Sequence, residues 1–164
     1  MGRAMNAIHK RRDAFIECLN QRDRLIWSIG KDTGLRIGDI LRLKRHEARK
    51  GTFTIIEHKT GKKKRCRLSE GTIRLFSLYV ISNPARGRQF IFINHRTGKP
   101  FTRQAIWYNF HKAGERVRLN RTGTHSMRKT YAQLMMASSD IEHTRKALNH
   151  KSSSITAVYL KQRR

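Results

Sequence analysis

The sequence has few acidic residues and no long apolar run. Asp and Glu together number 11 against 37 Lys and Arg, which gives a formal net charge of +26 on 164 residues. No apolar stretch approaches the roughly 20 residues that a membrane span requires, and the opening stretch MGRAMNAIHKRR lacks the apolar core of a secretion signal. These absences argue against a membrane-spanning or exported protein, and we expect a cytoplasmic one.

Residues and motifs for metal or nucleotide binding are also lacking. The two cysteines, Cys18 and Cys66, form no close pair, and neither CxxC nor HExxH spacing occurs. Acidic residues are too few to suggest a two-metal site. TGK occurs at 60–62 and at 97–99, but neither copy belongs to a Walker A loop. We therefore expect no metal and no cofactor.

Positive charge is the strongest feature that the sequence does contain. The basic residues are spread along the whole chain rather than gathered in a tail. A charge of this size repels itself within a compact fold and attracts polyanions, of which nucleic acid is the first candidate. A basic membrane-surface helix is one alternative, although the charge also covers strand-like and loop-like stretches. A structural RNA-binding protein is another, but RGG and aromatic RNP motifs are absent.

Apolar spacing and chain breakers predict short helices around one hairpin. Helical spacing covers residues 13–29 and is interrupted by Gly30 and the KDTG stretch. The run TFTIIE, the turn HKTGKKK and the run RCRL predict an antiparallel hairpin. Further helices are expected over RIGDILRL, from Ser69 to Asn83, from Thr102 to Ala113, over 125–137, from Ser139 to about Leu148 and over 152–160.

Two of these helices have candidate N-terminal caps. Thr124 is expected to cap the helix over 125–137, and Ser139 with Glu142 to form a capping box for the next one. The expected fold class is α+β, mostly helical, with a small antiparallel sheet or hairpin. Residues 13–164 are expected to form this one domain, with residues 1–12 as a linker or frayed N-terminus.

Metal-free cleavage of a phosphodiester needs residue types that this chain contains. Positive charge must stabilise the phosphate oxygens, a nucleophile must attack in line, and an acid must protonate the leaving oxygen. Arginine stays protonated and offers a planar fork to two oxygens. A tyrosine phenol, with a pKa near 10, needs a nearby base or a cationic pocket before it attacks. His125 and Arg128 share one helix face, although such pairs, like a lone Tyr159, are more often surface or packing residues.

Four stretches occur in the order of the signatures of a known family. TGLRIGDILRL, HKTGKKKR, THSMRKTYAQLMMA and LNHKSSSITAVYL resemble successive motifs of the tyrosine recombinases, the phage integrase family. The resemblance covers about residues 13–160 and implies the catalytic domain of that family. There is no room for the N-terminal domain that usually closes around the DNA, so the resemblance implies an excised domain or a minimal enzyme.

The resemblance also implies a role for each matching residue. Carried over by position, Arg36 and Arg128 resemble the arginines that clamp the scissile phosphate, and His125 and His150 resemble the histidines that bind its oxygens and assist proton transfer. Lys59 matches the lysine that protonates the leaving 5′ oxygen, and Tyr159 matches the nucleophile that becomes a 3′-phosphotyrosine. Asp39 matches an acidic residue that supports the site. Lys99, in the second TGK, is the alternative to Lys59, and the hairpin context favours Lys59. Lys129 stands where the family usually has a histidine.

A site-specific DNA recombinase is the function that the resemblance implies. Its substrate is double-stranded DNA, cut and rejoined through a Holliday junction by several protomers in a tetrameric synapse on paired sites. Two alternatives stay open: a nicking-closing enzyme resembling type IB topoisomerases, and a non-catalytic DNA-binding regulator. The presence of all six candidate catalytic residues argues against the regulator.

Overall fold

The computed structural model of the protein describes residues 2–84, 89–119 and 122–161. Its elements are α1 (Gly2–Glu17), α2 (Gln21–Thr33), α3 (Ile37–Ile40), α4 (Arg45–Ala48), β1 (Thr52–Ile56), β2 (Lys63–Arg67), α5 (Glu70–Ser82), α6 (Arg103–Arg116), α7 (Thr124–Ser138), α8 (Ile141–Ala147) and α9 (Ser153–Lys161). The prediction of a mostly helical domain with one small antiparallel sheet is confirmed. Among the described residues, no helix is long and apolar enough to cross a membrane.

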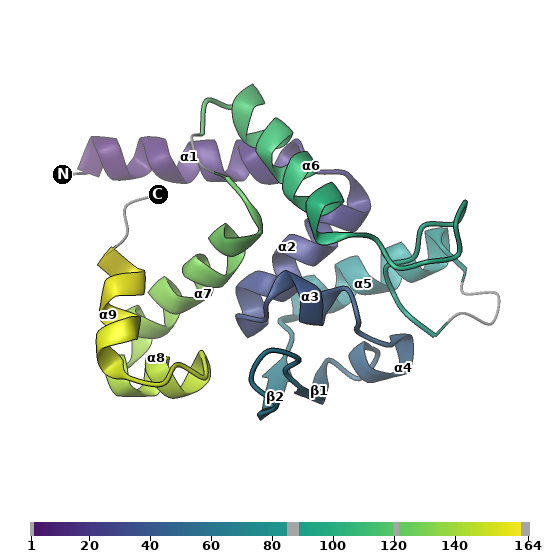
Figure 1. Ribbon diagram of the computed structural model, residues 1–164. Coiled ribbons are helices and arrows are strands. Elements are labelled where there is room, and N and C mark those ends of the chain that lie inside the picture. The colour runs from purple at the N-terminus through teal and green to yellow at the C-terminus, as the bar shows by residue number, and fades with distance from the viewer. Residues whose placement is uncertain (1, 85–88, 120–121, 162–164) are drawn as a thin grey trace.

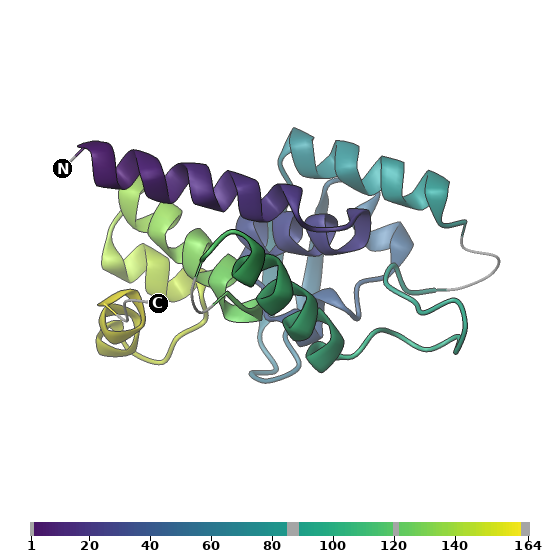
Figure 2. The ribbon, with the colours of Figure 1, turned by 90° about the horizontal axis from the view of Figure 1, so that it is seen from above.

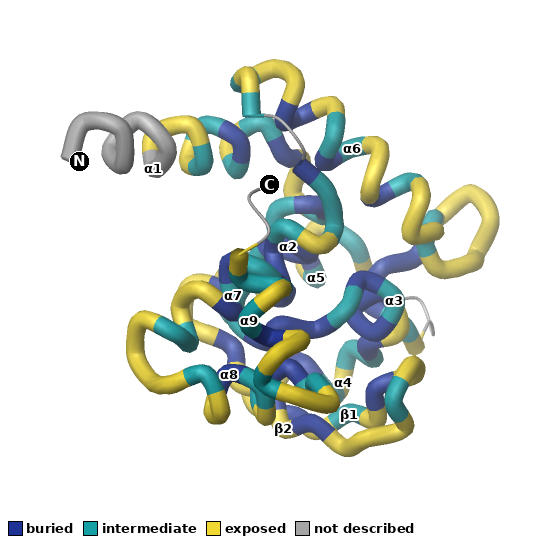
Figure 3. Tube along the Cα trace, turned by 60° about the vertical axis from the view of Figure 1, so that its left-hand side comes forward, coloured by how far each residue is buried: buried dark blue, intermediate teal, exposed yellow. Residues whose placement is uncertain are grey.

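Helix α2 lies at the centre of the molecule and contacts α7, α5, α3, β2, α1 and α6 (Figure 1). In Figures 1 and 2, α8 and α9 lie at the opposite end from α4. Figure 3 shows the buried stretches gathering around α2 and α3, while exposed stretches lie on the outer turns. The rings of Phe15, Trp27 and Phe110 pack edge to face, with centroids 4.9 to 5.9 Å apart, and join α1, α2 and α6.

The segment 13–29 is divided between two helices, contrary to the single helical stretch that its apolar spacing indicated. Asn20 caps α2, because its side chain accepts a hydrogen bond of 2.9 Å from the amide of Asp23. Helix α2 also continues through Gly30 and ends at Gly34, whose φ of 65° is the left-handed conformation that glycine adopts readily. Helix α1 begins at Gly2, inside the stretch expected to be a linker or frayed end.

Gly30 allows α2 and α7 to approach closely. A Cβ atom at Gly30 would lie 2.3 Å from the Sδ of Met127, which is fully buried. Because real Cβ atoms do not approach other atoms so closely, a larger residue here would push the two helices apart. The closeness of α2 and α7 matters for the site, since the segment that follows α2 carries Arg36 and the second turn of α7 carries Arg128.

The predicted hairpin forms, although its second strand begins at Lys63, two residues before the expected start. Strands β1 and β2 pair antiparallel, with Phe53 opposite Cys66. The two side chains are buried, whereas alternate residues of both strands face solvent. The turn between the strands contains Gly61 at a φ of 66°.

Two helix starts in the C-terminal half differ from their predicted caps. The N-cap of α7 is Gly123, one residue before Thr124. Helix α8 is capped by Asp140 rather than Ser139, because the Asp140 carboxylate accepts a hydrogen bond of 2.7 Å from the amide three residues further on. A carboxylate also complements the positive end of the helix dipole. Glu142 makes no capping box and instead accepts hydrogen bonds from Arg145 of the same helix and from Ser153 at the start of α9.

Candidate active site

A pocket of about 380 Å³ collects most of the candidate residues. Arg36, Lys59, His125 and Arg128, four of the six candidate catalytic residues, line it together. They come from the segment before α3, the hairpin turn and the first two turns of α7, which are more than 80 residues apart in sequence at the extremes. The fold therefore brings three of the four recognised motifs to one concave surface.

Arg36 is positioned by the end of α2. Gly34 stops the helix, and the buried Leu35 packs into the core, which leaves Arg36 extended at the N-cap of α3. Its side chain is 24% exposed, and its Nη1 lies 3.2 Å from Oε2 of Glu57. The guanidinium is thus partly open to the pocket and has one buried carboxylate beside it.

Arg128 is held far more tightly than Arg36. Its Nη2 donates a hydrogen bond of 2.6 Å to the carbonyl of Leu148, and its Nη1 donates to the carbonyl of Gly34. The residue is 3% exposed. Burial lowers the pKa of Arg128, and the charge of Arg36 lowers it further, while Glu57 opposes both effects. The guanidinium is therefore fixed in orientation, with N–H groups left over beyond the two carbonyl bonds.

The hairpin turn presents Lys59 as an exposed side chain at the pocket. The turn is tied to α3, because the amide of His58 donates a hydrogen bond of 3.0 Å to the Asp39 carboxylate. Asp39 is 7% exposed and also lines the pocket. Lys99 is not among the residues that line this pocket; it lies in a turn where its carbonyl accepts a bond from the amide of Asn94.

His150 and Tyr159 lie next to the pocket rather than among its lining residues. The two rings are perpendicular, with centroids 5.5 Å apart. The hydroxyl of Tyr159 donates to the backbone carbonyl of His125 over 3.4 Å, a long contact that ties α9 to the start of α7. The His150 ring is oriented through Nδ1, which lies 3.0 Å from the hydroxyl of Thr156.

The electrostatic field of the arginines reaches His150. Burial lowers the pKa of His150 to about 4, and the charges of Arg128 and Arg36 contribute to the shift. The imidazole is consequently neutral at pH 7, so it offers one donor and one acceptor nitrogen. The six candidates therefore form one connected group, which the sequence spacing alone did not establish.

A family model described as "Phage integrase family" matches residues 2–164. The chain belongs to the phage integrase family of tyrosine recombinases. A curated relative, the probable integrase/recombinase YoeC of Bacillus subtilis (strain 168), is 30% identical over 143 residues, which are 86% of this chain and 78% of that protein.

Solved structures of recombinases have the same fold as this integrase-family chain. The XerA recombinase superposes with a TM-score of 0.79 at 19% identity, over 94% of this chain and 58% of its own. The XerH recombinase bound to palindromic difH gives 0.76 at 22% identity, over 93% and 48%. A lambda integrase tetramer on a Holliday junction gives 0.72 at 18% identity, over 94% and 48%. The chain thus spans about half the length of these recombinases, and the expected fold and family are confirmed.

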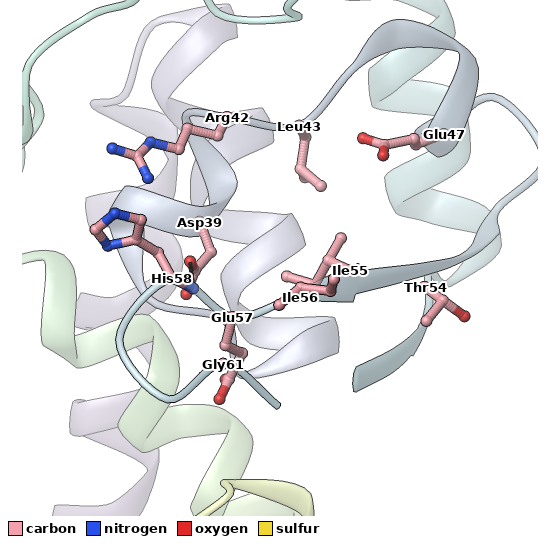
Figure 4. A pocket seen from close by; sticks show the side chains of 10 residues that line it. All are labelled: Asp39, Arg42, Leu43, Glu47, Thr54, Ile55, Ile56, Glu57, His58 and Gly61. Atoms are coloured by element: carbon pink, nitrogen blue, oxygen red, sulfur yellow. Dashed lines mark hydrogen bonds between the residues drawn. The ribbon is translucent and has the colours of Figure 1, made fainter. Parts of the chain in front are cut away.

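Several residues around the integrase pocket were not singled out from the sequence. Arg42, Arg103 and His58 line it beside the candidates, so its rim is strongly cationic. A neighbouring pocket of about 560 Å³ shares Arg42, His58 and Asp39 with this one. Figure 4 shows these three side chains gathered at one end of that neighbouring pocket. Arg42 could have been found from the sequence, because it lies three residues after Asp39 in the stretch RIGDILRL that was expected to be helical. Arg103 and His58 carry no comparable signal.

Lys64 is a second lysine close to the arginines. It is 8% exposed, and its Nζ donates a hydrogen bond of 2.5 Å to the carbonyl of Ala147. Burial lowers the pKa of Lys64 to about 8, and the charge of Arg128 acts in the same direction. The ammonium is thus committed to the end of α8, whereas Lys59 is accessible from the pocket. Within the described residues, no group of three or more His, Cys, Asp or Glu could hold a metal ion.

Proposed function

We propose that this chain catalyses tyrosine-type DNA strand transfer, with residues 13–164 as the catalytic domain. The Tyr159 oxygen attacks a DNA phosphate, and the bond from phosphorus to the 5′ oxygen breaks. Lys59 gives a proton to that oxygen, while the phenolic proton passes to a neighbouring base. The product is a 3′-phosphotyrosine, and attack by a 5′ hydroxyl reverses the reaction and rejoins a strand. The ester keeps the energy of the original bond, so the cycle needs no nucleotide.

The observation that carries this proposal is the shared pocket. Arg36 and Arg128 face it together with Lys59 and His125, which is the arrangement that charge stabilisation and proton donation at one phosphate require. Tyr159 adjoins it through its contact with His125. Neutral His150 faces the Tyr159 ring and supports proton transfer or a hydrogen bond to a phosphate oxygen.

Double-stranded DNA is the proposed substrate. A formal charge of +26 favours a polyanion, and exposed Arg42 and Arg103 extend the cationic surface beyond the scissile phosphate. The XerH and lambda integrase structures contain recombinases on DNA, including a tetramer on a Holliday junction. By analogy we propose that four copies of this chain assemble in a tetrameric synapse and exchange strands through such a junction. We propose that this reaction takes place in the cytoplasm.

The direct test is a Tyr159-dependent covalent adduct. A pool of nicked duplexes with randomised sequence traps cleavage, because the short 5′-hydroxyl fragment is lost and the reverse reaction stops. We expect a protein–DNA band that survives denaturation with the natural chain and with Tyr108→Phe, but not with Tyr159→Phe. Tyr108 is a suitable control because it is 55% exposed on α6 and does not line the pocket.

The same pool separates the alternative functions. DNA binding without an adduct would indicate a non-catalytic regulator. If an adduct forms, its selected sequence can be placed on paired sites to look for Holliday junctions, and on supercoiled DNA to look for relaxation. Relaxation without junctions would favour the nicking-closing enzyme over the recombinase.

A further inference from the structure

Glu57 is a buried acid at the centre of the cationic cluster. It follows β1 directly and is fully buried. In Figure 4 it lies where β1 runs into the hairpin turn, near Asp39 and His58. An isolated carboxylate is rarely buried to this extent, because the loss of hydration must be offset by charges or hydrogen bonds.

Both candidate arginines approach this one carboxylate. Oε2 of Glu57 lies 3.2 Å from Nη1 of Arg36, and Oε1 lies 3.8 Å from Nη1 of Arg128. Two guanidinium groups at a poorly hydrated site repel each other. A negative charge between them offsets the repulsion, so Glu57 occupies the electrostatic role that a DNA phosphate would have when bound.

Glu57 also connects the segments that carry the other candidates. Thr60 of the hairpin turn donates a hydrogen bond of 2.9 Å to Oε2, and so does the side chain of Asn149. Asn149 has a φ of 54°, a conformation that non-glycine residues rarely adopt, and it immediately precedes His150. The carboxylate therefore links the Lys59 turn to the loop before α9.

Glu57 is ionised at neutral pH in spite of its burial. Burial by itself raises the pKa of Glu57, but hydrogen bonds from Asn149 and Thr60 and the charges of Arg36 and Arg128 together hold it below its ordinary value. The contacts to the arginines are ionic rather than fully hydrogen-bonded. Among the described residues, Oε1 of Glu57 and Nη1 of Arg36 are buried without a hydrogen-bond partner. Such contacts can be exchanged for a phosphate oxygen without breaking a formed hydrogen bond.

We infer that Glu57 is a positioning residue, which serves as the resident counter-ion of the arginine clamp and holds Arg36 and Arg128 toward one pocket while no DNA phosphate is bound. The inference rests on the proposed function for the class of ligand, phosphate, but not on the occurrence of cleavage. Its test is therefore made on the protein without DNA.

The test is rescue of a charge-removing variant by a phosphate ion. Glu57→Gln keeps the shape of the side chain and removes its charge, and we expect Tm in low salt to fall by about 6–20 °C. Inorganic phosphate should restore more than half of that loss, because it neutralises the arginines in the pocket. Sodium chloride at equal ionic strength should restore much less. Glu70→Gln removes the same charge from an exposed position at the start of α5 and should show neither the loss nor the rescue.

A double variant keeps the test decisive if Glu57→Gln folds poorly. Adding Arg36→Ala removes one of the two repelling charges, so the double variant should melt no lower than Glu57→Gln alone. Additive losses from the two substitutions, or equal stabilisation of all variants by phosphate and chloride, would overturn the inference. Neither outcome bears on the adduct with Tyr159, so failure of the inference and failure of the proposed function are distinguishable.

Discussion

Truncation of Arg128 should damage the fold much more than truncation of Arg36, although both residues face the same pocket. Arg128→Ala would leave the carbonyls of Gly34 and Leu148 buried without their donor. A buried acceptor left unpaired costs about 1–3 kcal/mol, so the two together cost about 2–6 kcal/mol, and we take about 4 kcal/mol. Since about 1 kcal/mol corresponds to about 2–4 °C in Tm for a chain of this size, Tm should fall by about 8–16 °C.

Arg36→Ala removes one ion pair from a side chain that is 24% exposed. The buried partner, Glu57, keeps its contact with Arg128 and its hydrogen bonds from Thr60 and Asn149. The loss should therefore be about 1 kcal/mol or less, as for partly exposed pairs, and Tm should fall by about 4 °C or less. The assay is thermal unfolding of both variants beside Arg128→Lys, which keeps the charge but cannot bridge two carbonyls and should lie between them. Both Ala variants should still lose cleavage by about a hundred- to a thousandfold. Equal Tm losses for Arg36→Ala and Arg128→Ala would refute the reasoning from backbone anchoring.

Three further outcomes are expected. Lys59→Met should slow adduct formation by about 10²- to 10⁴-fold with little change in Tm, whereas Lys99→Met should leave the rate unchanged; equal losses would remove Lys59 as the proton donor. Gly34→Ala should lower the free energy of unfolding, measured in urea, by more than about 2 kcal/mol, because φ at this position is 65° and the added Cβ would lie 2.3 Å from an aromatic carbon. The control Gly61→Ala has a similar φ of 66° but open space around it, and should lower the free energy of unfolding by about 1 kcal/mol. The pKa of His150 is lowered to about 4 in the folded chain from an ordinary 6.5, so the unfolded chain takes up the proton first, and stability should fall as the pH drops from about 6.5 to about 4. His150→Gln should make the free energy of unfolding depend less on pH over this range. An unchanged pH dependence would contradict the lowered pKa of His150.

Local sequence signals predicted the hairpin and several helix limits well. Two helices begin where they were expected to begin, and their N-caps are Ser69 and Thr102, since a hydroxyl before an apolar-periodic run satisfies a free amide of the first turn. The break at Asn20 was missed because apolar spacing continues on both sides of it, from Phe15 to Leu25, and periodicity does not register a cap inside such a run.

The candidate site was predictable only through its motifs. Spacing placed His125 and Arg128 on one helix face, but nothing in the spacing brought Arg36 to the same pocket from about 90 residues away. The resemblance to the integrases supplied that expectation, and the roles it assigns remain predictions. Glu57 and Lys64 were missed because a single charged residue on a strand or directly after one reads as solvent-facing. Their burial depends on partners from other segments, which are the two arginines for Glu57 and the end of α8 for Lys64.

The account depends most directly on the chemical identity of the residue that joins DNA. Trapped complexes from the nicked-duplex pool can be digested with nuclease and trypsin, and the modified peptide sequenced by mass spectrometry. We predict that the nucleotide is carried by the tryptic peptide 152–161, on the phenolic oxygen of Tyr159, and that the phosphate is linked to the 3′ oxygen of the nucleotide. A nucleotide on any other residue, a 5′ linkage, or unmodified peptide from a chain that binds DNA tightly would contradict the account.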